Sequence, residues 1–156
     1  MPDPLIVELT PRPFAYVSLR STLPEMPATI GQGFATLGQL FAKAKAQMAG
    51  NPLAHYTDFD ETSASFDLGF PVLANDVPAL RTAGLSIGET PSGTSMTATH
   101  IGPYDTVAKT YDLMAAAMKE QGLSGTKDMW ESYLSPPDTP PNEIRTDVIW
   151  HVEEAR

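Results

Sequence analysis

The residues best suited to chemistry in this chain of 156 residues are an acid and a phenol two positions apart, Glu131 and Tyr133. They lie in the run Met129-Trp130-Glu131-Ser132-Tyr133-Leu134, which we interpret as a β-strand. In a strand, Glu131 and Tyr133 point to one face and Trp130 to the other. If Trp130 packs under a helix, Glu131 points toward a cleft; on an edge strand it would instead be an exposed surface glutamate.

A carboxylate in such a cleft could serve either binding or catalysis. Apolar and aromatic surroundings remove its hydration, which penalises the charged form. A bound organic cation would offset that penalty, and each nearby aromatic face would add about 0.5–2 kcal/mol by cation–π attraction. The same carboxylate beside tyrosine hydroxyls has the parts for water activation and carbonyl polarisation. Both classes of function therefore stay open.

The remaining candidate ligand contacts are aromatic or flexible side chains, and each has ordinary packing as its alternative. Tyr56 lies on a strand related to that of Tyr133, so either ring could line a cleft. Tyr104 follows Gly102-Pro103 at a helix entrance, where it either reaches the cleft mouth or packs against the helix start. For Trp150 and Phe70 core packing is the favoured role. The candidates are Tyr56, Phe70, Met96, Tyr104, Trp130 and Trp150.

Neither a metal nor a cofactor is expected from the motifs. His55, His100 and His151 are solitary on three different predicted strands, so each is interpreted as a satisfied or exposed histidine. The chain has no Gly-x-Ser-x-Gly elbow, no G-x-G-x-x-G run and no P-loop.

Composition excludes several classes of protein. With no cysteine, the chain has no disulfides, zinc-thiolate sites or cysteine nucleophiles. Lys and Arg number 10 against 19 Asp and Glu, for a net charge of −9, and the basic residues are scattered singly, so direct nucleic-acid binding is not expected. No apolar run reaches the ~18–20 residues that span a bilayer, and no signal peptide opens the chain. We expect a soluble, cytoplasmic protein that does not enter a membrane.

Helices and strands must position these residues. Apolar residues recur at helical spacing in the two long proline-free windows, 28–51 and 104–135, which predicts one helix in each; Asp105 is the expected N-cap of the second, and Gly122 its end. Alternating segments predict strands. These segments are 15–20, 53–59, 66–72, 94–101, 129–134 and 145–152.

The predicted order is strand, helix, strand, strand, and then the same again. The interpretation is one α+β domain over 1–156 made of tandem βαββ units. The first unit covers about 5–73 and the second about 93–153, and the connection at 74–92 holds a short strand near 85–89. Each unit would be an antiparallel sheet with a helix on one face, and a groove between the units is the expected ligand site.

Several short motifs resemble the GyrI-like small-molecule-binding domain family, which includes effector-binding domains of multidrug-responsive bacterial transcription activators. They are His100-Ile101-Gly102-Pro103-Tyr104-Asp105, Trp130-Glu131-Ser132-Tyr133-Leu134 and Thr146-Asp147-Val148-Ile149, with Tyr56-Thr57-Asp58 and Asp67-Leu68-Gly69-Phe70-Pro71-Val72 matching the first half. The resemblance implies pseudo-twofold symmetry and a glutamate, here Glu131, at the base of the cleft. No helix-turn-helix segment precedes the motifs, so we expect a stand-alone member.

Three functions follow from this resemblance. The first is binding of lipophilic, cationic or aromatic small molecules, with Glu131 as counter-charge. The second is hydrolysis of natural products that carry a strained cyclopropane ring, with Glu131 as general base and Tyr104 or Tyr133 as the polarising donor. The third is binding of a protein partner, as the gyrase-inhibitor name of the family suggests; given the charge of −9, that partner would need a basic face.

Overall fold

The computed structural model describes residues 4–103, 106–135 and 138–155. Its contacts divide the chain into two compact units, Pro11–Thr90 and Met1–Thr10 with Pro91–Arg156. We call these the N-terminal unit and the C-terminal unit. Within the described residues, no helix is long and apolar enough to cross a membrane.

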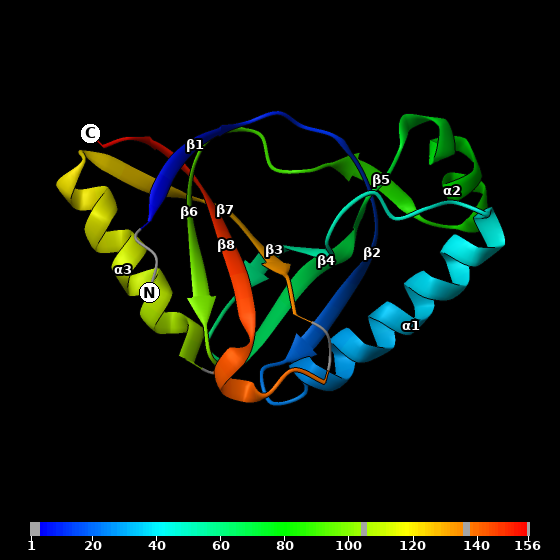
Figure 1. The fold of residues 1–156 in the computed structure, drawn as a ribbon, viewed down its shortest axis with the longest axis horizontal. Coiled ribbons are helices and arrows are strands. Elements are labelled where there is room, and N and C mark those ends of the chain that lie inside the picture. The colour runs from blue at the N-terminus through cyan, green and yellow to red at the C-terminus, as the bar shows by residue number, and fades with distance from the viewer. Residues whose placement is uncertain (1–3, 104–105, 136–137, 156) are drawn as a thin grey trace. The chain divides into compact units, whose positions relative to one another are not determined.

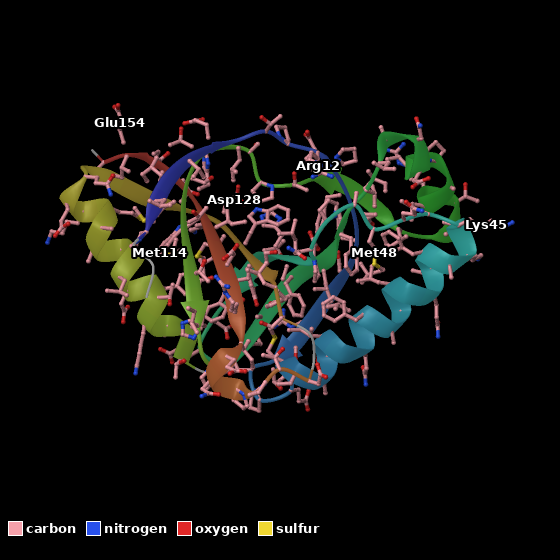
Figure 2. All side chains as sticks on the ribbon, viewed as in Figure 1. Arg12, Lys45, Met48, Met114, Asp128 and Glu154 are labelled. Carbon is pink, nitrogen blue, oxygen red and sulfur yellow. The ribbon has the colours of Figure 1, made fainter. Side chains whose placement is uncertain are left out.

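The C-terminal unit contains four antiparallel strands in the order β1-β6-β8-β7 and the helix α3 (Figure 1). Its elements are β1 (Leu5–Leu9), β6 (Gly93–Ile101), α3 (Val107–Glu120), β7 (Leu123–Tyr133) and β8 (Arg145–Glu154). One face of α3 packs on one face of the sheet. The core between them consists of Met96, Ala98, Met114, Met118, Val148 and Val152, and Figure 2 labels Met114 on α3.

The N-terminal unit has the strand order β3-β4-β2-β5, again antiparallel, with the helices α1 and α2. Its elements are β2 (Pro13–Thr22), α1 (Met26–Ala44), β3 (Leu53–Phe59), β4 (Ser63–Pro71), α2 (Val77–Ala83) and β5 (Ser86–Glu89). α1 approaches the sheet closely at Gly33, where a Cβ would lie 2.7 Å from Leu19 and 2.8 Å from Leu68. The α+β class is therefore confirmed, with antiparallel strands and a long helix in each unit.

α1 ends earlier than its proline-free window suggested. Lys45 adopts a left-handed conformation with φ of 55°, and the amide of Ala46 bonds to the carbonyl of Phe41, which closes the helix. Three residues on, the amide of Ala49 bonds to Pro71 at the end of β4. Met48 lies in that window but beyond the end of α1, and it is 44% exposed.

Two elements were not expected from the sequence. Residues 5–9 were assigned to the first unit, but Leu5–Leu9 form the strand β1, which pairs with β6 of the C-terminal unit. The predicted connection contains the helix α2, which begins with Pro78 in its first turn and ends at Gly84 with φ of 109°. The short strand predicted near 85–89 is confirmed as β5, which pairs with β2.

The second predicted helix is confirmed as α3. Its expected N-cap, Asp105, lies outside the described residues, and the helix begins after Thr106. Gly122 follows its end with a φ of 71°, a conformation that glycine adopts without strain. β7 begins at the next residue, so this turn delivers the chain directly to the strand that carries Glu131.

Candidate functional site

Glu131 is a buried carboxylate held by two phenol hydroxyls. Its side chain is 2% exposed. The Tyr111 hydroxyl of α3 donates to Oε2 at 2.8 Å, and the Tyr133 hydroxyl donates to Oε1 at 3.3 Å. Each carboxylate oxygen therefore accepts at least one hydrogen bond from a tyrosine of the same unit.

Glu131 faces α3, which corrects the expected placement of Trp130 under the helix. Pairing puts Glu131 opposite Val148, a member of the core beneath α3, and directly opposed residues share a face of the sheet. Trp130 pairs with Ile149 on the opposite face, where its indole N–H donates to Asp128 at 3.0 Å. The alternation along β7 was right, but the helix covers the face of the glutamate and not that of the tryptophan.

An aromatic pair lies beside the carboxylate. The rings of Tyr111 and Trp150 meet edge to face, with centroids 5.7 Å apart. Trp150 is fixed by a bond of 2.7 Å from its indole N–H to the carbonyl of Thr126. Its ring also lies over Gly125, where a Cβ would come within 2.5 Å of the indole. The Tyr111 phenol thus touches a tryptophan on its ring and a carboxylate at its hydroxyl.

The start of α3 is tied to β6 through His100, which is 2% exposed. Its Nε2 lies 3.0 Å from the carbonyl of Pro103 and 3.0 Å from the hydroxyl of Thr106, and its Nδ1 lies 2.8 Å from the hydroxyl of Thr110. A carbonyl only accepts, so Nε2 carries a proton, and in the neutral ring Nδ1 accepts from Thr110. His100 is therefore a satisfied histidine, as predicted.

The other candidate residues fall into three groups. Met96 is fully buried in the core under α3, so it is a packing residue. Phe70 packs on Phe41 of α1 with centroids 5.7 Å apart, and Tyr56 packs on Phe66 at the same distance; both belong to the N-terminal unit. Tyr104 lies outside the described residues.

No group of three or more His, Cys, Asp or Glu side chains suited to a metal occurs in the part of the chain that the structure describes. His151 lies on β8, opposite Ser95 of β6. His55 lies on β3, opposite Asp67 of β4.

Tyr111 was not among the candidate residues predicted from the sequence. A signal for it existed: it is a tyrosine on the inward stripe of an amphipathic helix, and a buried phenol hydroxyl needs a hydrogen-bond partner. Its partner lies 20 residues away on β7, a separation that no local pattern specifies.

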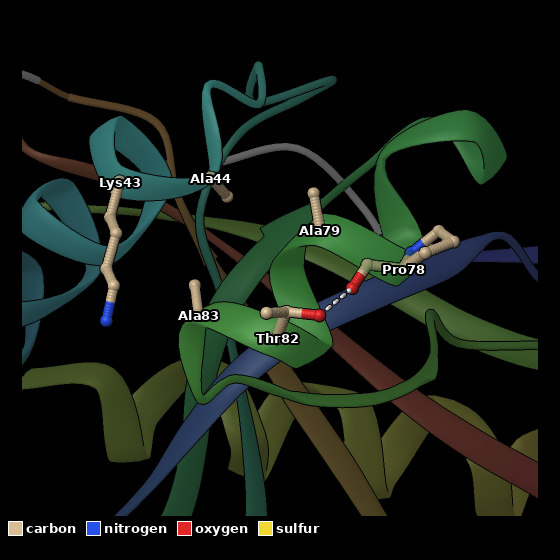
Figure 3. Close-up of a pocket in the computed structure, with 6 residues that line it drawn as sticks. All are labelled: Lys43, Ala44, Pro78, Ala79, Thr82 and Ala83. Carbon is tan, nitrogen blue, oxygen red and sulfur yellow. Dashed lines mark hydrogen bonds between the residues drawn. The ribbon is translucent and has the colours of Figure 1, made fainter.

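A separate open pocket of about 330 Å³ lies in the N-terminal unit between the end of α1 and α2 (Figure 3). Small side chains dominate its lining, and the hydroxyl of Thr82 donates a hydrogen bond to the carbonyl of Pro78 at 3.0 Å. The lining residues are Lys43, Ala44, Pro78, Ala79, Thr82 and Ala83. Among the described residues that line this pocket, none carries a carboxylate or an aromatic ring, unlike the surroundings of Glu131.

Comparison with known proteins identifies the family. The model of the GyrI-like small molecule binding domain matches residues 2–153, so the chain belongs to that family of ligand-binding domains. Among curated proteins no match to the chain was found.

Solved structures of the same fold cover nearly the whole chain at low identity. The EcmrR C-terminal domain has a TM-score of 0.70 and 17% identity, covering 98% of each chain. A hydrolase from Listeria innocua has a TM-score of 0.69 and 15% identity, and the match covers 97% of this chain and 92% of the hydrolase chain. SAV2435, solved bound to tetraphenylphosphonium, has a TM-score of 0.63 and 12% identity, and the match covers 97% of this chain and 94% of the SAV2435 chain. At these identities, the comparisons establish the fold.

Proposed function

We propose that the protein binds lipophilic organic cations or aromatic small molecules, with Glu131 as the counter-charge. The observation that carries this proposal is a carboxylate 2% exposed, hydrogen-bonded by Tyr111 and Tyr133 and adjoined by the Tyr111–Trp150 ring pair. Family membership supports small-molecule binding, and this site supplies the chemistry that selects the ligand.

The hydrogen bonds leave the charge of the site in place. Both tyrosine hydroxyls are neutral donors, so they stabilise the carboxylate without cancelling its negative charge. In a low-dielectric setting that charge attracts a cation more strongly than it would in water. The faces of Tyr111 and Trp150 carry the negative part of the aromatic quadrupole, which adds to the attraction.

The solved relatives suggest a suitable probe. Tetraphenylphosphonium, the ligand of SAV2435, combines a permanent positive charge with four phenyl groups. Tetraphenylborate has nearly the same shape and the opposite charge, so the two probes separate electrostatic recognition from apolar burial.

Calorimetric titration of both ions into the wild type, E131Q and E120Q tests the proposal. Glu120 is an exposed residue at the end of α3, so E120Q controls for the loss of one negative charge. We expect the phosphonium to bind and the borate not to bind, and E131Q to lose about tenfold or more in affinity while E120Q keeps it. Equal affinity of E131Q and the wild type would exclude Glu131 as the counter-charge.

A second candidate function is hydrolysis of a strained cyclopropane ring conjugated to a carbonyl. It is favoured by the same carboxylate and phenols, together with the hydrolase from Listeria innocua of the same fold. Glu131 would take a proton from water as the oxygen bonds to the ring carbon, and the electron pair of the broken carbon–carbon bond would pass to the carbonyl. The Tyr133 hydroxyl, or that of Tyr104, would donate to this carbonyl oxygen.

Turnover distinguishes the two functions. Mass spectrometry of a cyclopropane-bearing compound incubated with catalytic amounts of protein would detect a product heavier by one water. A hydrolase forms many equivalents of this product per protein molecule, and E131A forms none. A binding protein captures at most one equivalent of unchanged compound.

A further inference from the structure

We propose that His100 is a positioning residue that sets where Tyr111 meets Glu131. It touches neither the carboxylate nor the phenol and acts through the hydrogen bond to Thr110, the residue just before Tyr111 on α3. The functional part of this inference rests on the proposed ligand site at Glu131. The positional part stands without any ligand.

His100 lies on the same sheet face as the site. In the pairing of β6, β8 and β7, His100 is opposite Thr146, and Thr146 is opposite Tyr133. Glu131 is two residues before Tyr133 on β7 and therefore points to that face as well. α3 thus crosses a sheet that presents a histidine on one strand and a glutamate two strands away.

α3 is bonded to both of those strands by consecutive residues. Thr110 is 0% exposed, and its hydroxyl meets Nδ1 of His100 on β6 at 2.8 Å. Tyr111 meets Oε2 of Glu131 on β7, also at 2.8 Å. Neighbouring residues of a helix move together. The hydrogen bond at Thr110 therefore restricts both the rotation of α3 about its axis and the distance of the Tyr111 phenol from the sheet.

The His100 ring is itself immobilised. Nε2 bonds to the carbonyl of Pro103 in the segment that leads into α3, and the hydroxyl of Thr106 bonds to the same carbonyl at 2.7 Å. A fixed ring presents Nδ1 at one point only. Packing alone could be supplied by apolar residues at positions 100 and 110, whereas a directional bond also specifies the orientation of the helix.

Two matched substitutions at Thr110 separate this bond from simple packing. T110V keeps the shape and removes the hydroxyl, and T110S keeps the hydroxyl and removes a methyl group. The readout is the pair of indole N–H signals in a ¹H–¹⁵N spectrum, since the chain has only two tryptophans. Trp150 touches the Tyr111 ring, whereas Trp130 lies on the opposite face of the sheet.

We expect T110V to move the indole signal of Trp150 and to leave that of Trp130 in place, with T110S close to the wild type at both. H100Q should act like T110V, because its amide can replace the donor at Nε2 but not the acceptor at Nδ1. It also provides the test if T110V does not fold. An unchanged Trp150 signal in a folded variant, or equal movement of both signals, would overturn the proposal.

The consequence for the ligand site is measured separately with tetraphenylphosphonium. We expect T110V to weaken its binding by about three- to tenfold, the range for loss of one neutral hydrogen bond. In a Y111F background, T110V should weaken binding no further, because the hydroxyl that the His100–Thr110 bond positions is gone. If T110V weakens binding equally in both backgrounds, His100 does not act through Tyr111. If the wild type does not bind the probe, the proposed function fails, and the Trp150 signals still decide the positioning role.

Discussion

The hydroxyl of Tyr111 donates to Oε2 of Glu131 at 2.8 Å and joins the second turn of α3 to the strand β7. A buried charge is tolerated only where polar groups replace its lost hydration. Here that replacement comes from a helix that the core residues Met114 and Met118 also hold on the sheet. Packing of α3 and stabilisation of the carboxylate therefore depend on each other.

Removal of the Tyr111 hydroxyl is expected to cost more stability than removal of the Tyr133 hydroxyl. Y111F deletes the shorter bond to a buried charge, worth about 1.5–3 kcal/mol, while Y133F deletes one of 3.3 Å. Urea unfolding at pH 7 gives both changes in the free energy of unfolding. In an E131Q background the cost of Y111F should shrink, because the acceptor no longer carries a charge; equal costs in both backgrounds would contradict this coupling.

The Trp150 ring needs a residue without a side chain beneath it. A Cβ at position 125 would lie 2.5 Å from the Trp150 indole, which is a rigid planar ring. We expect G125A to destabilise the protein by about 1–3 kcal/mol and to change the fluorescence of Trp150. The control is G31A in α1, where nothing lies within 4 Å of the added methyl group; it should be neutral or stabilising by about 0.5–1 kcal/mol. Similar losses in both variants would contradict a specific clash with Trp150.

Local periodicity was enough to predict most of the fold. Alternation and helical spacing identified both long helices and six of the strands, because each pattern is repeated over many residues. α2 has only seven residues, and its Pro78 and Gly84 indicate a loop as readily as a helix with a proline start and a glycine end. The end of α1 was missed because a lysine, Lys45, takes the left-handed conformation that closes the helix, and this conformation is typical of glycine rather than lysine.

The site was predictable only in part. Period two along β7 correctly put Glu131 and Tyr133 on one face, but alternation does not say which face a helix covers. The expectation that Glu131 points toward a cleft depended on Trp130 packing under the helix. The register with β8 decides otherwise, because it places Glu131 opposite Val148 in the core beneath α3. Register and helix docking join residues far apart in sequence, which also explains why Tyr111 was missed.

Ser95 offers a test of buried polarity. Its side chain is 1% exposed, and its hydroxyl has no hydrogen-bond partner among the described residues. A buried hydroxyl without a partner costs free energy, so S95A should be neutral or should raise the melting temperature. Ser21 is the matched control, a buried strand serine bonded at 2.8 Å to both the carbonyl of Thr22 and the hydroxyl of Thr29. S21A should lower stability by about 1 kcal/mol, and a loss in S95A as large as that would show that the Ser95 hydroxyl is bonded in solution.

Asp60 gives the turn between β3 and β4 a dependence on pH. The backbone amides of Thr62 and Ser63 donate to its carboxylate at 2.8 and 2.9 Å and, with the amide of Thr62 contributing most, hold the pKa of Asp60 below its ordinary value of 3.8. A carboxyl whose pKa is lower in the folded state stabilises the fold above the unfolded value, and this contribution is lost as the pH falls through the folded value. The stability of the wild type relative to D60N should therefore be greatest near neutral pH and should shrink below about pH 4. Urea unfolding between pH 7 and pH 3 measures it, with D112N on the exposed side of α3 as a control for the loss of one negative charge. If the stability of the wild type relative to D112N shrinks by the same amount over this pH range, the effect comes from the net charge of −9 and not from the turn.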